Sequence, residues 1–183
     1  MDFLEGRFLV ATPQLLDPNF ARTVVLLIQH SEQGALGVVL NRRLDKTVAE
    51  LWKQVSTAPS KSREQVHFGG PVTGPLLAVH TLADLAEMEI VPGVFFAAQK
   101  DHLDALVGRQ ESEFRIFLGH SGWGGGQLEA EIAAGAWLTA PASRDTIFAS
   151  SEDLWETVTR QIGREFLGST LRIQDFPEDP SVN

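Results

Sequence analysis

The 183-residue chain contains no cysteine and no tyrosine. Without cysteine it can form no disulfide, use no thiolate nucleophile and hold no cysteine-ligated metal. Its five histidines are scattered along the chain, without a His-x-x-x-His or His-x-His pair. The sequence therefore predicts no metal site and no cofactor.

Long hydrophobic runs are also missing. The longest, such as Val24 to Ile28, are far short of the roughly 20 apolar residues that a membrane-spanning helix needs. The first residues, Met1 to Phe8, carry early acidic side chains and no basic region ahead of an apolar stretch, which is unlike a secretory signal. We expect a cytoplasmic protein that does not associate with membranes.

Basic residues are in the minority, with 15 against 24 acidic ones and a net charge of −9. Such a balance disfavours binding to phosphate backbones and anionic lipids. The charge is uneven, however: residues 41–63 carry six basic and two acidic side chains, a net +4 that leaves −13 on the remainder. This basic strip is typical of a solvated face, and a docking site for an acidic partner is the alternative interpretation.

The apolar segments are short, rich in Val, Ile, Leu and Phe, and bounded by Gly, Pro, Asn and Asp, which is typical of strands. We expect strands at residues 6–11, 23–30, 35–41, 65–68, 76–82, 94–99, 114–118, 136–140 and 146–149. Helices are expected at 47–55, 100–109, 127–134 and 151–167. The clearest local signals are a hairpin closed by Ser31–Gly34 and a capping box formed by Thr47 and Glu50.

These elements predict an α+β fold, a compact single unit with a mixed, largely antiparallel β-sheet flanked by helices. We expect residues 1–183 to form one domain, with the polar, proline-containing segment 168–183 as a loosely packed tail.

The glycine-rich segment Gly119–Gly126 begins like a nucleophile elbow, Gly-x-Ser-x-Gly, centred on Ser121. Trp123 stands where the second glycine belongs. His120 is adjacent to Ser121, and neighbouring side chains on a turn usually diverge. The base would have to come from elsewhere, for example His30 or His80, so a hydrolase using Ser121 is an alternative hypothesis only.

Glycines before a helix can also expose amides to a phosphate. Here no Lys-Ser/Thr follows the glycines, and Glu129 and Glu131 fall in the first helical turn, where they complement the helix dipole and repel an anion. A structural role for the glycines is therefore preferred, and the surface around Trp123 is the expected ligand or partner site. The bend Gly69–Pro71 would frame a cleft with this segment if the two fold together.

Several sequence blocks occur in order along nearly the whole chain and identify a family. They are Phe3–Leu4, Leu9–Pro13, Asp17–Phe20, Gly34–Arg42, Phe68–Val72, Gly119-x-x-Gly122-Trp123, Gly126–Glu129 with Glu131, Trp137, and Asp179–Ser181 with Asn183. On these blocks the chain resembles the YqgE/AlgH family of bacterial proteins. The resemblance implies a compact α+β protein with a mixed sheet.

The family is sometimes described as transcriptional regulators, through an association with the control of alginate synthesis. It carries no established catalytic residues to transfer, and its motif fixes Gly-Trp and Gly-Gln-Leu-Glu more than the preceding serine, which weakens the case for Ser121. The residues that the resemblance and the basic strip point to as binding candidates are Asn41, Arg42, Gly69, Gly70, Pro71, Gly122, Trp123, Gln127 and Glu129.

The leading functional hypothesis is a non-enzymatic regulatory or binding protein that acts through an unidentified protein or small-molecule partner. A direct DNA-binding regulator is a further alternative. The 41–63 strip supports it, while the net charge of −9 and the lack of a helix-turn-helix with a basic recognition helix oppose it. Any regulation of transcription is therefore expected to be indirect.

Overall fold

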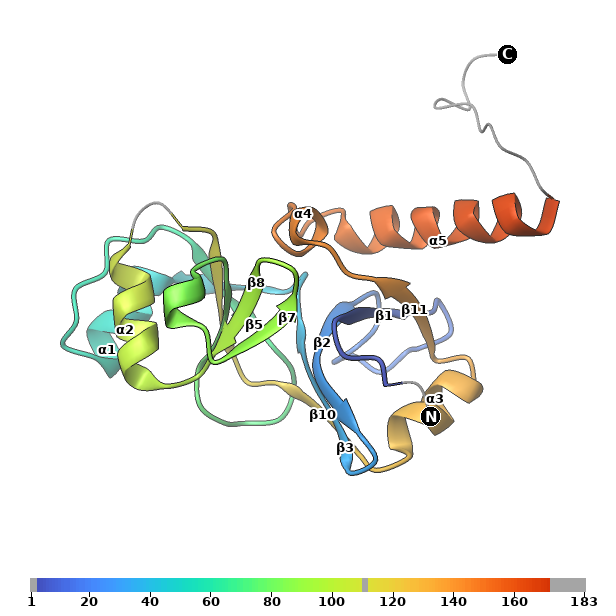
Figure 1. Ribbon diagram of the computed structural model, residues 1–183, viewed down its shortest axis with the longest axis horizontal. Coiled ribbons are helices and arrows are strands. Elements are labelled where there is room, and N and C mark those ends of the chain that lie inside the picture. Colours follow the sequence, from blue (N-terminus) through green and yellow to red (C-terminus); the bar gives the residue numbers. More distant parts are fainter. Residues whose placement is uncertain (1–2, 110–111, 172–183) are drawn as a thin grey trace, which may run out of the picture.

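The computed structural model describes residues 3–109 and 112–171, and it divides the strands between two sheets (Figure 1). The first sheet is antiparallel throughout and contains β1 (Arg7–Ala11), β2 (Val24–Ser31), β3 (Gly34–Val39), β10 (Ser121–Gly124) and β11 (Trp137–Pro141), in the order β10-β3-β2-β1-β11. The second contains β4 (Arg43–Thr47), β5 (Gln65–Phe68), β6 (Leu77–His80), β7 (Met88–Val91), β8 (Val94–Ala97) and β9 (Phe114–Leu118), in the order β4-β5-β9-β6-β8-β7. Its β5–β9 pair is parallel and its other pairs are antiparallel.

Helices cover the outer faces of both sheets (Figure 1). Helices α1 (Val48–Val55) and α2 (Lys100–Gly108), with the short 3-10 helix η1 (Ala83–Leu85), pack on the second sheet. Helix α3 (Gln127–Ala133) packs on the first sheet, and α4 (Arg144–Ile147) and α5 (Leu154–Leu171) pack at the edge of the space between the sheets. Among the described residues, no helix is long and apolar enough to cross a membrane.

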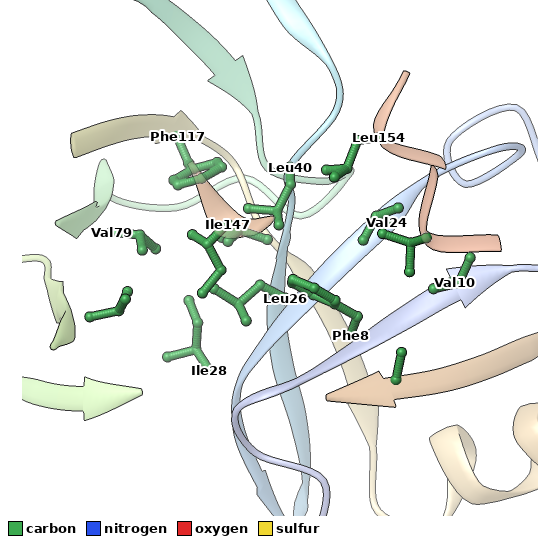
Figure 2. Packing of buried hydrophobic residues seen from close by; sticks show 14 of the residues in the cluster. Phe8, Val10, Val24, Leu26, Ile28, Leu40, Val79, Phe117, Ile147 and Leu154 are labelled. Carbon is green, nitrogen blue, oxygen red and sulfur yellow. The ribbon is translucent and has the colours of Figure 1, made fainter. Parts of the chain in front are cut away.

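The main hydrophobic core lies between the two sheets. Leu26 of the first sheet and Phe117 of the second belong to one buried cluster, which Ile147 and Leu154 of the helices complete (Figure 2). The alternate β2 residues Val25 and Leu27 belong to the opposite cluster under α3. Strand β2 is therefore buried on both faces, as its continuous apolar run predicts.

The predicted α+β class with largely antiparallel pairing is confirmed, although the strands form two sheets. The β2–β3 hairpin is confirmed. So is the capping box, in which the Glu50 amide donates to the Thr47 hydroxyl and the Glu50 carboxylate accepts from the Thr47 amide.

The local structure differs from the predictions in several places. Residues 146–149 are not a strand: α4 ends at Ile147, and the Ser143 hydroxyl caps it by accepting from the Thr146 amide. Helix α5 continues through residues 168–171 of the predicted tail, and the rest of that tail, 172–183, lies outside the described residues. Strands β4, β7 and β10 form where the sequence predicts no strand.

The chain crosses between the sheets at residues 40–42 and again at 119–120, and backbones touch directly at this junction. The Gly69 carbonyl accepts from the Val39 amide at 2.9 Å and from the Ser121 hydroxyl at 3.0 Å. Gly70 has φ +150°, and a Cβ placed on it would lie 2.3 Å from the carbonyl carbon of His120. The junction therefore requires glycine at this position.

We predict that Gly70→Ala destabilises the protein by at least about 3 kcal/mol, because the backbone itself must move to admit the methyl group. Gly93→Ala is the matched control: Gly93 also has positive φ (+76°), but no atom lies within 4 Å of the added carbon. It should cost about 1–2 kcal/mol. Urea unfolding measures both changes, and equal losses would contradict the close-contact explanation.

Candidate functional site

Asn41 and Arg42 hold the loop before β2. The Asn41 side chain accepts from the Val24 amide at 2.9 Å and donates to the Arg22 carbonyl at 2.9 Å. Arg22 has φ +57°, a left-handed conformation that is uncommon outside glycine, so this clamp fixes a strained residue. The Arg42 guanidinium donates to the carbonyls of Pro18 and Ala21, and burial lowers the pKa of Arg42 while Asp17 acts in the opposite direction.

Trp123 is buried, with only 5% of its surface exposed. Its indole N–H and that of Trp137 both donate to the same Glu131 carboxylate oxygen, each at 2.9 Å. Gln127 donates to the other oxygen of Glu131 and accepts from the Gly124 amide. Trp123, Gln127 and Glu131 thus form a network that joins β10, α3 and β11.

Glu129 lies beside this network and forms a hydrogen bond with the buried histidine His30. Its Oε1 is 2.9 Å from His30 Nε2, and the Leu4 amide donates to His30 Nδ1. A hydrogen bond to its own backbone amide is the largest cause that lowers the pKa of Glu129; burial acts in the opposite direction, and His30 lowers the pKa further. These side chains have defined roles within the fold, and binding by Glu129, Gln127 or Trp123 stays a prediction.

Ser121 is fully buried within β10, where it pairs with Gly37 of β3. Its hydroxyl donates to the Gly69 carbonyl at 3.0 Å. The segments Gly69–Pro71 and Gly119–Ser121 do lie together, but their backbones are in contact and fill the space between them. The geometry therefore gives a nucleophilic Ser121 no support.

We predict that a fluorophosphonate probe does not label the folded protein, because Ser121 is inaccessible and its hydroxyl is engaged. Mass spectrometry after labelling measures this, with a known serine hydrolase as positive control. Ser121→Ala should lower the free energy of unfolding by about 1 kcal/mol, the typical loss of one hydrogen bond. Labelling that disappears in Ser121→Ala would restore the hydrolase hypothesis.

A cavity of about 300 Å³ lies between the second sheet and the connection from α4 to α5. Its lining residues are Arg43, Glu64, His67, Ser112, Glu113, Phe114, Arg115, Phe148, Ala149 and Ser150. Strand pairing builds it: Arg43 is opposite His67 across β4 and β5, and His67 is opposite Phe117 across β5 and β9. Arg115, two residues before Phe117, projects from the same face of the sheet.

Arg115 is a buried cation that is only 7% exposed. Its guanidinium donates to the carbonyl of Leu40 at 3.0 Å and to that of Ala149. Within the described chain, no carboxylate forms an ion pair with it. Burial, and then the charge of Arg43, lowers the pKa of Arg115 to about 10, while Glu64 acts in the opposite direction.

His67 is 4% exposed, and neither of its ring nitrogens has a hydrogen-bond partner of ordinary geometry among the described residues. Burial lowers its pKa to about 3, helped by the positive charges of Arg115 and Arg43, while a weak backbone interaction at Gln65 opposes the change. At neutral pH the ring is therefore uncharged, with one N–H and one lone pair unused. Together Arg43, His67 and Arg115 offer donors to an anion.

No motif in the sequence points to this site. Arg43 is part of the basic strip of residues 41–63, while His67 and Arg115 lie in predicted strands without a recognisable spacing. The signal that could have found it is a charged residue, Arg115, within the apolar strand predicted at 114–118. In the part of the chain that is described, no group of three His, Asp or Glu side chains is arranged to hold a metal ion.

Comparison with known proteins identifies the family. Residues 8–167 match the family described as AlgH-like. The chain belongs to the AlgH-like family. The resemblance to AlgH noted in the sequence is thus confirmed over most of the chain.

Relatives of similar length share this family. The chain is 37% identical to a UPF0301 protein of Chlorobaculum tepidum, over 97% of this chain and 95% of that one, and 37% identical to one of Xanthomonas oryzae, over 94% of each. The solution structure of the AlgH protein of Pseudomonas aeruginosa superposes with a TM-score of 0.71 at 30% identity, covering 97% and 96% of the two chains. A crystal structure from Corynebacterium diphtheriae gives 0.71 at 28% identity, covering 88% of each. The family is uncharacterised, and these names state no activity.

Proposed function

We propose that this protein is a non-enzymatic regulatory protein that works by binding an anionic partner or ligand in the cavity of Arg43, His67 and Arg115. The buried guanidinium of Arg115 carries this proposal. Removing an unpaired cation from water costs several kcal/mol, and two carbonyl groups neutralise none of its formal charge. A bound anion would supply the missing counter-charge.

The basic strip of residues 41–63 supports the same proposal. Arg43 lines the cavity, while Lys61 and Arg63 line a second cavity of about 260 Å³ that shares Glu64, Ser112 and Phe114 with the first. Clustered positive charge beside an opening attracts anions and speeds their association. On an otherwise acidic protein, this face is therefore the one suited to an acidic partner.

Any effect on transcription would then pass through the bound partner rather than through DNA, which the net charge of −9 disfavours. The proposal takes the whole chain as one functional unit acting in the cytoplasm. No catalytic step is included, since the Ser121 hydroxyl is buried and engaged with the Gly69 carbonyl.

We predict that small anions raise the melting temperature, measured by differential scanning fluorimetry at constant ionic strength with a panel of phosphates, sulfate and carboxylates. At a ligand concentration of about 100 times Kd the protein gains about 2.7 kcal/mol, or roughly 5–10 °C for this size. Arg43→Gln should reduce the shift, because Arg43 lines the cavity and is itself exposed.

Lys53→Gln is the matched control: Lys53 belongs to the basic strip and is exposed on α1, away from the cavity lining. It should keep the full shift. If no anion in the panel raises the melting temperature, or if Arg43→Gln responds like the unaltered protein, binding at this cavity is refuted.

A further inference from the structure

We propose that the cavity binds the phosphate group of a small molecule, and that His67 takes up a proton as this group binds. The inference rests on the proposed function, because it specifies the anion that the same cavity receives. It is carried by three donor groups that come from three neighbouring strands: Arg43 from β4, His67 from β5 and Arg115 from β9.

The number of donors favours a tetrahedral oxyanion. A guanidinium has five N–H donors, and the two bonds of Arg115 to Leu40 and Ala149 leave three of them for a ligand. Arg43 provides a second guanidinium, and both nitrogens of His67 lack partners among the described residues. A phosphate group offers three strong acceptor oxygens, one for each donor group, whereas a carboxylate has only two.

Charge balance favours a doubly charged group together with a proton. The lining contains Arg43 and Arg115 as cations and Glu64 and Glu113 as anions. Arg144 neutralises Glu113 through two hydrogen bonds, at 2.9 and 2.6 Å. The net charge of this set is thus +1 with a neutral His67 and +2 with a protonated one, and the latter matches a phosphate dianion.

The charged groups around His67 explain why it should take up a proton when the anion binds. The charged groups around it are Arg43 on β4, Arg115 on β9, Glu64 in the segment before β5, and the Glu113–Arg144 pair at the rim. Burial, helped by the positive charges of the two arginines, lowers the pKa of His67 and keeps the imidazole neutral. A dianion between the arginines cancels their repulsion and attracts an imidazolium, so the pKa of His67 rises on binding.

The size of the cavity indicates a small molecule rather than a free ion. About 300 Å³ is at the lower end of the range for small-molecule sites and leaves space beyond the phosphate group. A phosphate monoester should therefore bind more tightly than inorganic phosphate. Glycerol phosphate and inorganic phosphate, titrated side by side, distinguish these two sources of the same chemistry.

Isothermal titration calorimetry with sulfate tests the proton. Sulfate is a tetrahedral dianion that holds no proton near neutral pH, so any proton taken up must go to the protein. We expect uptake approaching one proton per sulfate, measured in two buffers of different ionisation enthalpy. The affinity should rise by up to about tenfold per pH unit below the pKa of His67 in the complex, and acetate at equal ionic strength should bind more weakly.

Two variants test whether His67 is the residue that takes up the proton. His67→Gln should abolish both the proton uptake and the pH dependence. His102→Gln is the control, because His102 is a partly exposed histidine on α2 that pairs with Glu87 away from the cavity lining; it should change neither. Circular dichroism checks that each variant is folded, and Arg43→Gln, at an exposed position, should weaken sulfate binding without disturbing the core.

The outcomes separate this inference from the function on which it rests. Sulfate binding that depends on Arg43 but occurs without proton uptake would overturn the role of His67 and leave anion binding standing. Acetate binding as tight as sulfate would overturn the phosphate assignment. Failure of every anion to bind would refute both proposals, and sulfate binding unaffected by Arg43→Gln would place the anion elsewhere and overturn this inference.

Discussion

Direct contact between backbones, where Gly69–Gly70 meets Gly119–Ser121, is the constraint on which the two-sheet arrangement depends. A side chain at Gly69 or Gly70 would clash with the main chain of the facing segment. Because no side chains separate the segments, the Gly69 carbonyl can accept from both Val39 and Ser121. The end of β5 is thereby tied to β3 and β10, and the buried cluster between the sheets (Figure 2) requires this relative position.

The same junction positions the cavity. Arg43 begins β4 immediately after the first crossing, and His67 lies two residues before Gly69. Arg115 donates to Leu40 at that crossing and to Ala149 at the end of the helical connection. Its side chain therefore spans from the second sheet to both neighbouring segments, so the cation stabilises the arrangement and also faces the cavity.

Local signals account for what the sequence could predict. The β2–β3 hairpin and the Thr47-capped helix depend on neighbouring residues, so a short window contains their information. Strand β10 depends on a distant partner: Ser121–Gly124 is rich in glycine and becomes a strand only because β3 is available beside it. The strand predicted at 146–149 is wrong for another reason. A segment of four residues is too short to show whether its apolar residues repeat with the period of a strand or of a helix.

The candidate site escaped prediction because its residues are ordinary in type and meet only in the fold. Glycine and tryptophan motifs attract attention, yet Trp123, with Gln127 and Glu131, is engaged in holding β10, α3 and β11 together. A more physical signal was a cation within an apolar strand. Side chains alternate between the two faces of a strand, so Arg115 of Phe114–Leu118 lies on the same face as Phe117. A cation buried there needs a counter-charge. Arg115 donates to two carbonyls, and no carboxylate of the described residues forms an ion pair with it. We therefore seek that counter-charge in a ligand.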